Sequence, residues 1–200
     1  SELNEDQERA LKEFISFMAK PNVKHMVLSG SAGVGKGYLL RHIQKNWERV
    51  SLLATLLNTD ANTYEPEFTA TTNEAVYQLG IESASTIYSR AGLVPGYKGL
   101  RAIKSPDMMS GTIVVDEASY IDESAFHKIV HQLPNCKFVW VMDQDQLAPV
   151  GSSIPYVTTQ GFDTSELTII ERNKGPLQDL VRELRHGVRH QHGVDIRKHH

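Results

Sequence analysis

The chain has 200 residues, of which 40% are hydrophobic and 22% are charged, a composition typical of one globular domain with a single core. A formal net charge of −3 and an isoelectric point near 6.3 exclude a protein that coats nucleic acid electrostatically, so any nucleic-acid contact has to be local. One cysteine, Cys136, excludes an internal disulfide and a cysteine-based metal cluster. No apolar run approaches the roughly 18 residues of a membrane span, so we expect a cytoplasmic protein without membrane contacts.

The first part of the chain predicts the order helix, strand, glycine-rich loop, helix. Apolar residues at helical spacing indicate an amphipathic helix over 4–19. The short run KHMVLSG, residues 24–30, is typical of a buried strand, and residues 36–47 show a helical pattern directly after the loop. The next segment, 51–64, fits either a short helix or a strand with a polar turn.

Farther along the chain, predicted strands alternate with predicted helices. We expect strands over 65–72, 112–119, 136–144 and 166–172, and helices over 73–80, 123–132 and 176–186. The stretch 92–111 is rich in glycine and proline and carries several basic residues, which predicts an exposed loop or insertion. Polar residues follow the predicted strands at their carboxyl ends. This pattern predicts an α/β fold with a mostly parallel sheet flanked by helices.

The glycine-rich loop GSAGVGKGY, residues 30–38, satisfies the spacing G-x-x-x-x-G-K of a phosphate-binding loop. In such loops backbone N–H groups point at phosphate oxygens, and a lysine, here Lys36, reaches the outer phosphates. The expected cofactor contacts are Gly30, Ser31, Ala32, Gly33, Val34, Gly35, Lys36, Gly37 and Tyr38. The serine or threonine that should bind magnesium is replaced by Gly37. A glycine-rich turn without ligand is the alternative interpretation of this segment.

Polar residues after three later strands fit nucleotide hydrolysis. Asp116 directly follows a buried strand and can hold Mg²⁺ through its water shell, while Glu117 can orient or deprotonate an attacking water. Gln146 follows the next strand, and its amide can sense a terminal phosphate. Arg172 follows the last strand and can pair with developing phosphate charge. An acidic pair at a strand end is common, so the order of these residues is stronger support than any one of them.

With these motifs in this order, the chain resembles the first RecA-like motor domain of superfamily 1 DNA helicases, in the Dda and RecD-like branch. The segments that carry the resemblance are LNEDQERAL, SGSAGVGKG, TATTNEA, ASTIYSRAGL, VVDEAS, MDQDQLAPVG and LTIIERNKGPLQDLVRELRHG. The resemblance implies a RecA-like P-loop NTPase fold, ATP and Mg²⁺ as cofactors, and 5′ to 3′ movement on single-stranded DNA in a bacterial or phage-infected cell. It assigns residues 1–187 to the motor domain. Residues 188–200 are expected to form a polar tail, and their terminal histidines are typical of a purification tag.

The resemblance also assigns roles to residues outside the loop. It makes Gln7 the contact to the adenine base. The implied contacts to single-stranded DNA are Thr71, Thr72, Asn73, Thr86 and Tyr88. Small hydroxyl residues can grip phosphates without reading bases, and a tyrosine can stack on a base. The alternative for residues 71–73 is that they cap the helix that follows them.

Three departures from the family pattern keep several functions open. Gly37 lacks the metal-binding hydroxyl, and the stretch 92–111 is short where relatives carry a strand-separating pin. Family members build the ATP site between two motor domains, so a second motor domain is expected as the partner that completes this site. Tyr97 in that stretch is either a wedge or an exposed loop residue. The alternatives to a helicase motor are a degenerate nucleotide- or DNA-binding module without turnover, and another phosphate-loop class such as an assembly ATPase or a small-molecule kinase.

Overall fold

A six-stranded parallel sheet forms the centre of the molecule, with strand order β3-β2-β6-β7-β1-β8. The computed structural model describes residues 2–31, 33–61, 64–143, 154–169 and 184. The strands are β1 (His25–Gly30), β2 (Glu67–Ala70), β3 (Ser85–Thr86), β6 (Gly111–Asp116), β7 (Cys136–Asp143) and β8 (Asp163–Leu167). The predicted parallel α/β architecture is therefore confirmed.

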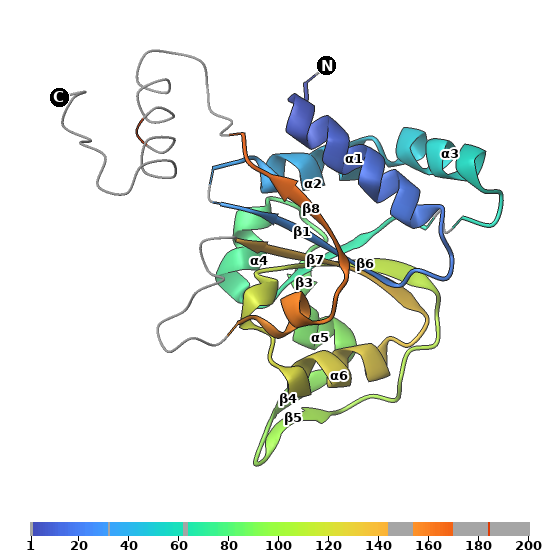
Figure 1. The fold of residues 1–200 in the computed structure, drawn as a ribbon. Coiled ribbons are helices and arrows are strands. Elements are labelled where there is room, and N and C mark those ends of the chain that lie inside the picture. The colour runs from blue at the N-terminus through green and yellow to red at the C-terminus, as the bar shows by residue number, and fades with distance from the viewer. Residues whose placement is uncertain (1, 32, 62–63, 144–153, 170–183, 185–200) are drawn as a thin grey trace.

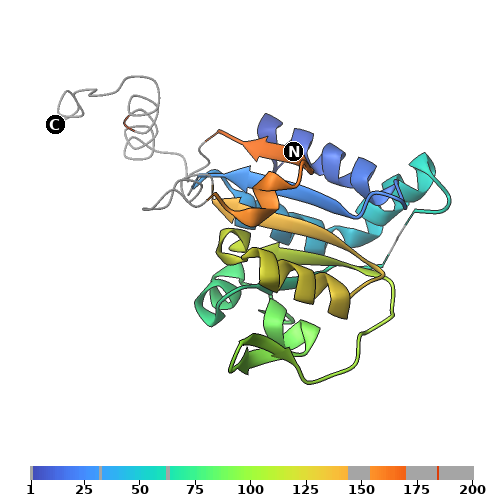
Figure 2. The same cartoon turned by 60° about the horizontal axis from the view of Figure 1, so that its bottom comes forward.

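Helices cover both faces of this sheet, as Figures 1 and 2 show. Those on one face are α1 (Glu5–Met18), α2 (Lys36–Lys45), α3 (Trp47–Leu57) and α4 (Asn73–Leu79). Those on the other face are α5 (Ile87–Ala91), α6 (Glu123–Gln132) and the short 3₁₀ helices η1 (Ala118–Tyr120) and η3 (Tyr156–Thr159). Strands β6 and β7 are nearly continuous apolar runs because both of their faces are covered. Neighbouring residues of one strand, such as Val114 and Val115, belong to opposite cores.

Local signals set the helix ends that the sequence predicted. Asn4 and Gln7 form a capping box at the start of α1, which confirms the first predicted helix. The Thr72 hydroxyl accepts a hydrogen bond from the backbone N–H of Ala75 at 3.1 Å, and Gly80 ends α4 in the left-handed conformation with φ 67°. The ambiguous segment after residue 50 is helical as far as Leu57, within α3.

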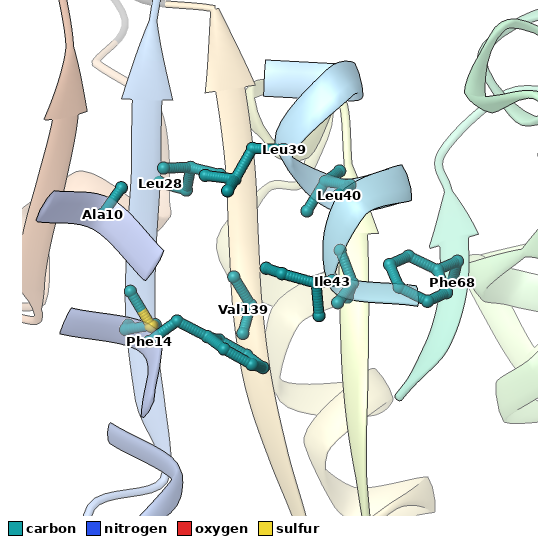
Figure 3. A pocket seen from close by; sticks show the side chains of 10 residues that line it. Ala10, Phe14, Leu28, Leu39, Leu40, Ile43, Phe68 and Val139 are labelled. Atoms are coloured by element: carbon teal, nitrogen blue, oxygen red, sulfur yellow. The ribbon is translucent and has the colours of Figure 1, made fainter. Parts of the chain in front are cut away.

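Figure 3 shows how α1 and α2 are fixed on the sheet. Side chains of both helices and of four strands enclose a small space, lined by Ala10, Phe14, Met26, Leu28, Leu39, Leu40, Ile43, Phe68, Val114 and Val139. Its volume of about 10 Å³ is no larger than a water molecule needs, so this space is packed core and not a ligand site. The packing holds the first turn of α2, and with it the phosphate loop, at a fixed place above β1.

Two segments differ from the prediction. The stretch expected to be a loop contains an antiparallel hairpin, β4 (Leu93–Gly96) and β5 (Gly99–Ala102), whose turn presents Tyr97 with 99% of its surface exposed. Strand β8 begins at Asp163 and not at residue 166, because it pairs with β1 from Met26 to Gly30. As an edge strand it buries only alternate residues. Its sequence therefore lacks the continuous apolar run that predicts the buried strands. No helix in the described ranges is long and apolar enough to cross a bilayer.

Candidate functional site

The carboxyl edge of the sheet, where its parallel strands end, brings the predicted site residues together. Gly30 at the end of β1 pairs with Asp143 of β7, and Asp116 at the end of β6 pairs with Ala70 of β2. Loops that follow adjacent parallel strands meet at one edge, which is where open α/β sheets bind ligands. Gln146 and Arg172, predicted to act at the same edge, lie outside the described residues, as does Ala32.

The phosphate loop connects β1 to α2 through a backbone that depends on glycine. Gly33 and Gly35 both have φ 85°, in the left-handed region. A Cβ on Gly30 would lie 2.5 Å from Val34 Cγ2 and 2.8 Å from the carbonyl oxygen of Leu167, so no larger residue fits there without movement. Successive backbone N–H groups in such a turn form a concave anion site at the positive end of the following helix.

Lys36 lies over this loop from the first position of α2. Its Nζ donates to the carbonyl oxygens of Gly30 at 2.5 Å and Ser31 at 3.2 Å. A lysine ammonium in this place can exchange main-chain carbonyls for phosphate oxygens, because both are acceptors for its three N–H groups. Burial raises the pKa of Asp116, and Lys36 is close enough for its charge to oppose that rise in part.

Gln7 lies beside the loop but uses its amide within the protein. Its side chain is fully buried, Oε1 accepts from the backbone N–H of Asn4 at 3.0 Å, and Nε2 donates to the carbonyl oxygen of Gly35 at 3.2 Å. The amide therefore ties α1 to the phosphate loop, and its contact with a base stays a prediction. Tyr38 is 40% exposed, and its hydroxyl lies 3.5 Å from Glu2 Oε2.

The acidic turn after β6 is held in an unusual backbone conformation. Glu117 has φ 57°, the one positive φ of a non-glycine residue in the described part of the chain. Its N–H donates to Asp116 Oδ1 at 2.9 Å. Thr71 secures the turn from the neighbouring strand end, since its hydroxyl donates to the carbonyl oxygen of Glu117 at 3.0 Å and its N–H to that of Asp116 at 3.2 Å. Strained backbone of this kind is typical of functional sites.

Burial raises the pKa of Asp116 to about 6, and the nearby carboxylates of Glu117 and Asp143 add to the shift. The N–H of Glu117 and the ammonium of Lys36 act in the opposite direction. A carboxylate that is costly to ionise gains most from a cation placed beside it. Asp116 therefore suits a role beside Mg²⁺. The motif expects a second oxygen ligand from a hydroxyl at residue 37, but Gly37 has no side-chain oxygen.

The residues predicted to contact DNA lie at the ends of β2 and β3 and in the helices that follow. Thr72 caps α4, and the Thr86 hydroxyl accepts from the N–H of Ser89 at 3.1 Å to cap α5. Capping, the alternative weighed for this segment, is therefore a real function of Thr72. Asn73 is the first residue of α4, and Tyr88 is half-buried against the core of the α6 face, where burial raises the pKa of its hydroxyl. DNA contact at these positions stays a prediction.

One residue near the loop was not singled out from the sequence. Arg41 lies one helical turn after Gly37, and its Nη1 donates to the carbonyl oxygen of Leu79 at 3.2 Å. A Cβ on Gly37 would lie 3.1 Å from the same Nη1. The i, i+4 spacing of residues 37 and 41 in a predicted helix was the only available signal for this contact.

Known proteins match the chain over nearly its whole length. The AAA domain family matches residues 2–200. The ATP-dependent DNA helicase dda of Enterobacteria phage T4 is 25% identical over 198 residues, which cover 93% of this chain and 43% of that protein.

Solved structures show the same fold. Unliganded Pif1 from Bacteroides sp superposes with a TM-score of 0.53 at 16% identity, covering 92% of this chain and 45% of that one. The Bacteroides sp Pif1 complex with ADP-AlF4 gives 0.54 at 17% identity and covers 92% and 46%. The chain spans less than half the length of each of these relatives. The chain belongs to the AAA domain family, and it is similar to the Dda and Pif1 helicases over nearly its whole length.

Proposed function

We propose that this chain is the ATP-binding motor domain of a DNA helicase that moves 5′ to 3′ on single-stranded DNA. The observation that carries the proposal is the meeting of Lys36, Asp116 and Glu117 at the carboxyl edge of one parallel sheet. The similarity to a phage protein named as an ATP-dependent DNA helicase supports the assignment of this edge to ATP. A second motor domain is proposed as the partner that completes the site.

The proposed roles follow from the placement of each group. Lys36 binds the β and γ phosphates above the loop amides, and Glu117 holds the attacking water and accepts its proton. Asp116 would hold Mg²⁺, which supplies charge neutralisation for the phosphates when it is bound. Gln146 and Arg172 are proposed, from the family resemblance, to couple the state of the terminal phosphate to movement against the second domain.

A degenerate module that binds nucleotide without turnover is the second candidate function. Gly37 favours it, because the residue after Lys36 has no side-chain oxygen for a metal ion. DNA-stimulated ATP hydrolysis separates the two candidates when it is measured at a stated salt concentration on a protein that includes a second motor domain. Equal hydrolysis by the glycine form and a Gly37→Thr variant excludes the degenerate module, and hydrolysis by the threonine form alone supports it.

The phosphate-loop assignment itself is tested on the 200-residue chain with Lys36→Ala. We expect ATP binding, measured by calorimetry, to weaken at least about 100-fold, since charge-assisted hydrogen bonds to phosphate contribute about 1.5–3 kcal/mol each. Lys45→Ala is the matched control, because it removes an exposed lysine from the other end of the same helix. Equal affinity of the two variants would remove the basis for a nucleotide site here.

A further inference from the structure

The guanidinium of Arg41 lies against the place where residue 37 would carry a side chain. Any residue larger than glycine would place its Cβ 3.1 Å from Arg41 Nη1, closer than ordinary van der Waals contact. The guanidinium is held there by its bond to the carbonyl oxygen of Leu79, the last residue of α4. Helix carboxyl ends favour cations, so α4 stabilises the charged group in this position.

A phosphate-loop hydroxyl at residue 37 would bring its metal ion near the same guanidinium. A hydroxyl oxygen lies about 1.4 Å from its Cβ, and Mg²⁺ lies about 2.1 Å from an oxygen ligand, so the metal would be at most about 3.5 Å from that Cβ. Arg41 Nη1 lies 3.1 Å from the same point, so it and the metal ion would be at most about 6.6 Å apart. Two cations at such a separation repel each other outside bulk water. The guanidinium therefore disfavours a metal ion bound to residue 37.

A guanidinium is chemically suited to the phosphates that the metal would otherwise contact. It is charged at every pH of interest, and two of its five N–H donors can bind two oxygens of one phosphate at the same time. The bond to Leu79 uses one of these donors. Lys36 and Arg41 both lie in α2, and Gly37, whose Cβ position Arg41 approaches, directly follows Lys36.

We infer that Arg41 is a nucleotide-binding residue that replaces the metal-bound hydroxyl lost at Gly37, so that this chain binds a nucleoside triphosphate with little dependence on Mg²⁺. The inference rests on the proposed nucleotide site and specifies how that site neutralises phosphate charge. Gly37 and Arg41 then act together, because the absence of a side chain at residue 37 leaves room for the guanidinium of Arg41.

The test is ATP binding by calorimetry to the 200-residue chain, in magnesium chloride and in EDTA at matched ionic strength. We expect the unmodified chain to bind with about the same affinity in both. Arg41→Gln should lose about 10- to 100-fold in EDTA, the effect of one charged hydrogen-bonding group. Arg41→Lys should retain most of the affinity, because it keeps the charge. Gly37→Thr should displace the guanidinium and introduce a dependence on Mg²⁺.

Controls separate this inference from the proposed function. Arg49→Gln removes an exposed arginine from α3 and should leave binding unchanged in both solutions. If the unmodified chain loses as much affinity in EDTA as Gly37→Thr does, or if Arg41→Gln binds like the unmodified chain in EDTA, the inference is wrong. In that case Lys36→Ala still decides whether the nucleotide site exists. Comparison of the unmodified chain with Gly37→Thr needs no arginine variant, so the test holds even if Arg41→Gln does not fold.

Discussion

The two edges of the central sheet differ in what their side chains and backbone do. At the carboxyl edge, Gly35 and Glu117 have left-handed backbone, and polar groups converge on the phosphate loop. At the amino edge, His25 and Lys137, near the starts of β1 and β7, are enclosed by partners. The same two strands thus contribute stability at one end and carry the proposed nucleotide site at the other. A substitution should therefore affect folding or ligand binding, depending on the edge it changes.

At the amino edge, substitution of Lys137 is expected to change the free energy of unfolding most. Its side chain is 2% exposed, and Nζ donates to the carbonyl oxygens of Phe17 at 3.0 Å, Lys20 at 2.6 Å and Val23. The ammonium also lies 4.2 Å from the centre of the Phe17 ring. These carbonyls belong to the end of α1 and the turn after it, so Lys137 fixes the helix that also contacts the phosphate loop.

We predict that Lys137→Met lowers the free energy of unfolding by about 2–4 kcal/mol, because it leaves buried carbonyl groups without donors. Urea unfolding followed by tryptophan fluorescence measures the change. Lys12→Met, at an exposed position on α1, is the control and should shift stability by less than about 0.5 kcal/mol. ATP affinity of the folded variant should be unchanged. A large loss of affinity without a loss of stability would contradict the division between the edges.

At the carboxyl edge, substitution of Thr71 is expected to affect ATP hydrolysis. Its hydroxyl holds the carbonyl of Glu117, the proposed holder of the attacking water. Thr71→Val should lower kcat for ATP hydrolysis about fivefold, the effect of one neutral hydrogen bond, with little change in KM. The assay needs a protein with both motor domains. Thr71→Ser keeps the hydroxyl and should restore most of the rate, whereas equal rates for valine and threonine would exclude this positioning role.

His25 makes stability at the amino edge depend on pH. Its Nδ1 accepts from Trp140 Nε1 at 3.1 Å, and its ring stacks on Phe162 with centroids 4.4 Å apart. Burial, together with the charge of Lys24, lowers the pKa of His25 to about 4. The unfolded chain takes up this proton near pH 6.5 and the folded chain only near 4, so stability is lost as the pH falls between these values.

The measurement is urea unfolding at several pH values from 7 to about 4, compared with His25→Phe. The variant keeps a ring in the stack but has no proton to bind, so its stability should fall less steeply over this range. Parallel curves for the two proteins would show that His25 does not titrate as its surroundings predict.

The sequence predicted those parts of the molecule in which neighbouring residues decide the structure. The run from β1 through the phosphate loop to α2, the cap at Thr72 and the stop at Gly80 are all local patterns. The start of β8 depends on pairing with β1, and the hairpin after residue 92 is too short and polar to show a strand pattern.

The contacts that complete the site could not be predicted, because they join residues distant in sequence. Thr71 and Glu117 are 46 positions apart and meet only because β2 and β6 are adjacent. Arg41 and Leu79 are 38 positions apart and meet where α2 and α4 pack on the same face. Motif order identifies which residues share an edge of the sheet, but it contains no information on which donor each acceptor finds.

The left-handed backbone of Glu117 has a consequence for the folding free energy of this turn. A side chain incurs a steric penalty of order 1 kcal/mol in that conformation, which glycine avoids. The catalytic role proposed for Glu117 therefore places a carboxylate where the backbone alone would tolerate glycine better, and the contacts from Thr71 help to hold the turn in that conformation.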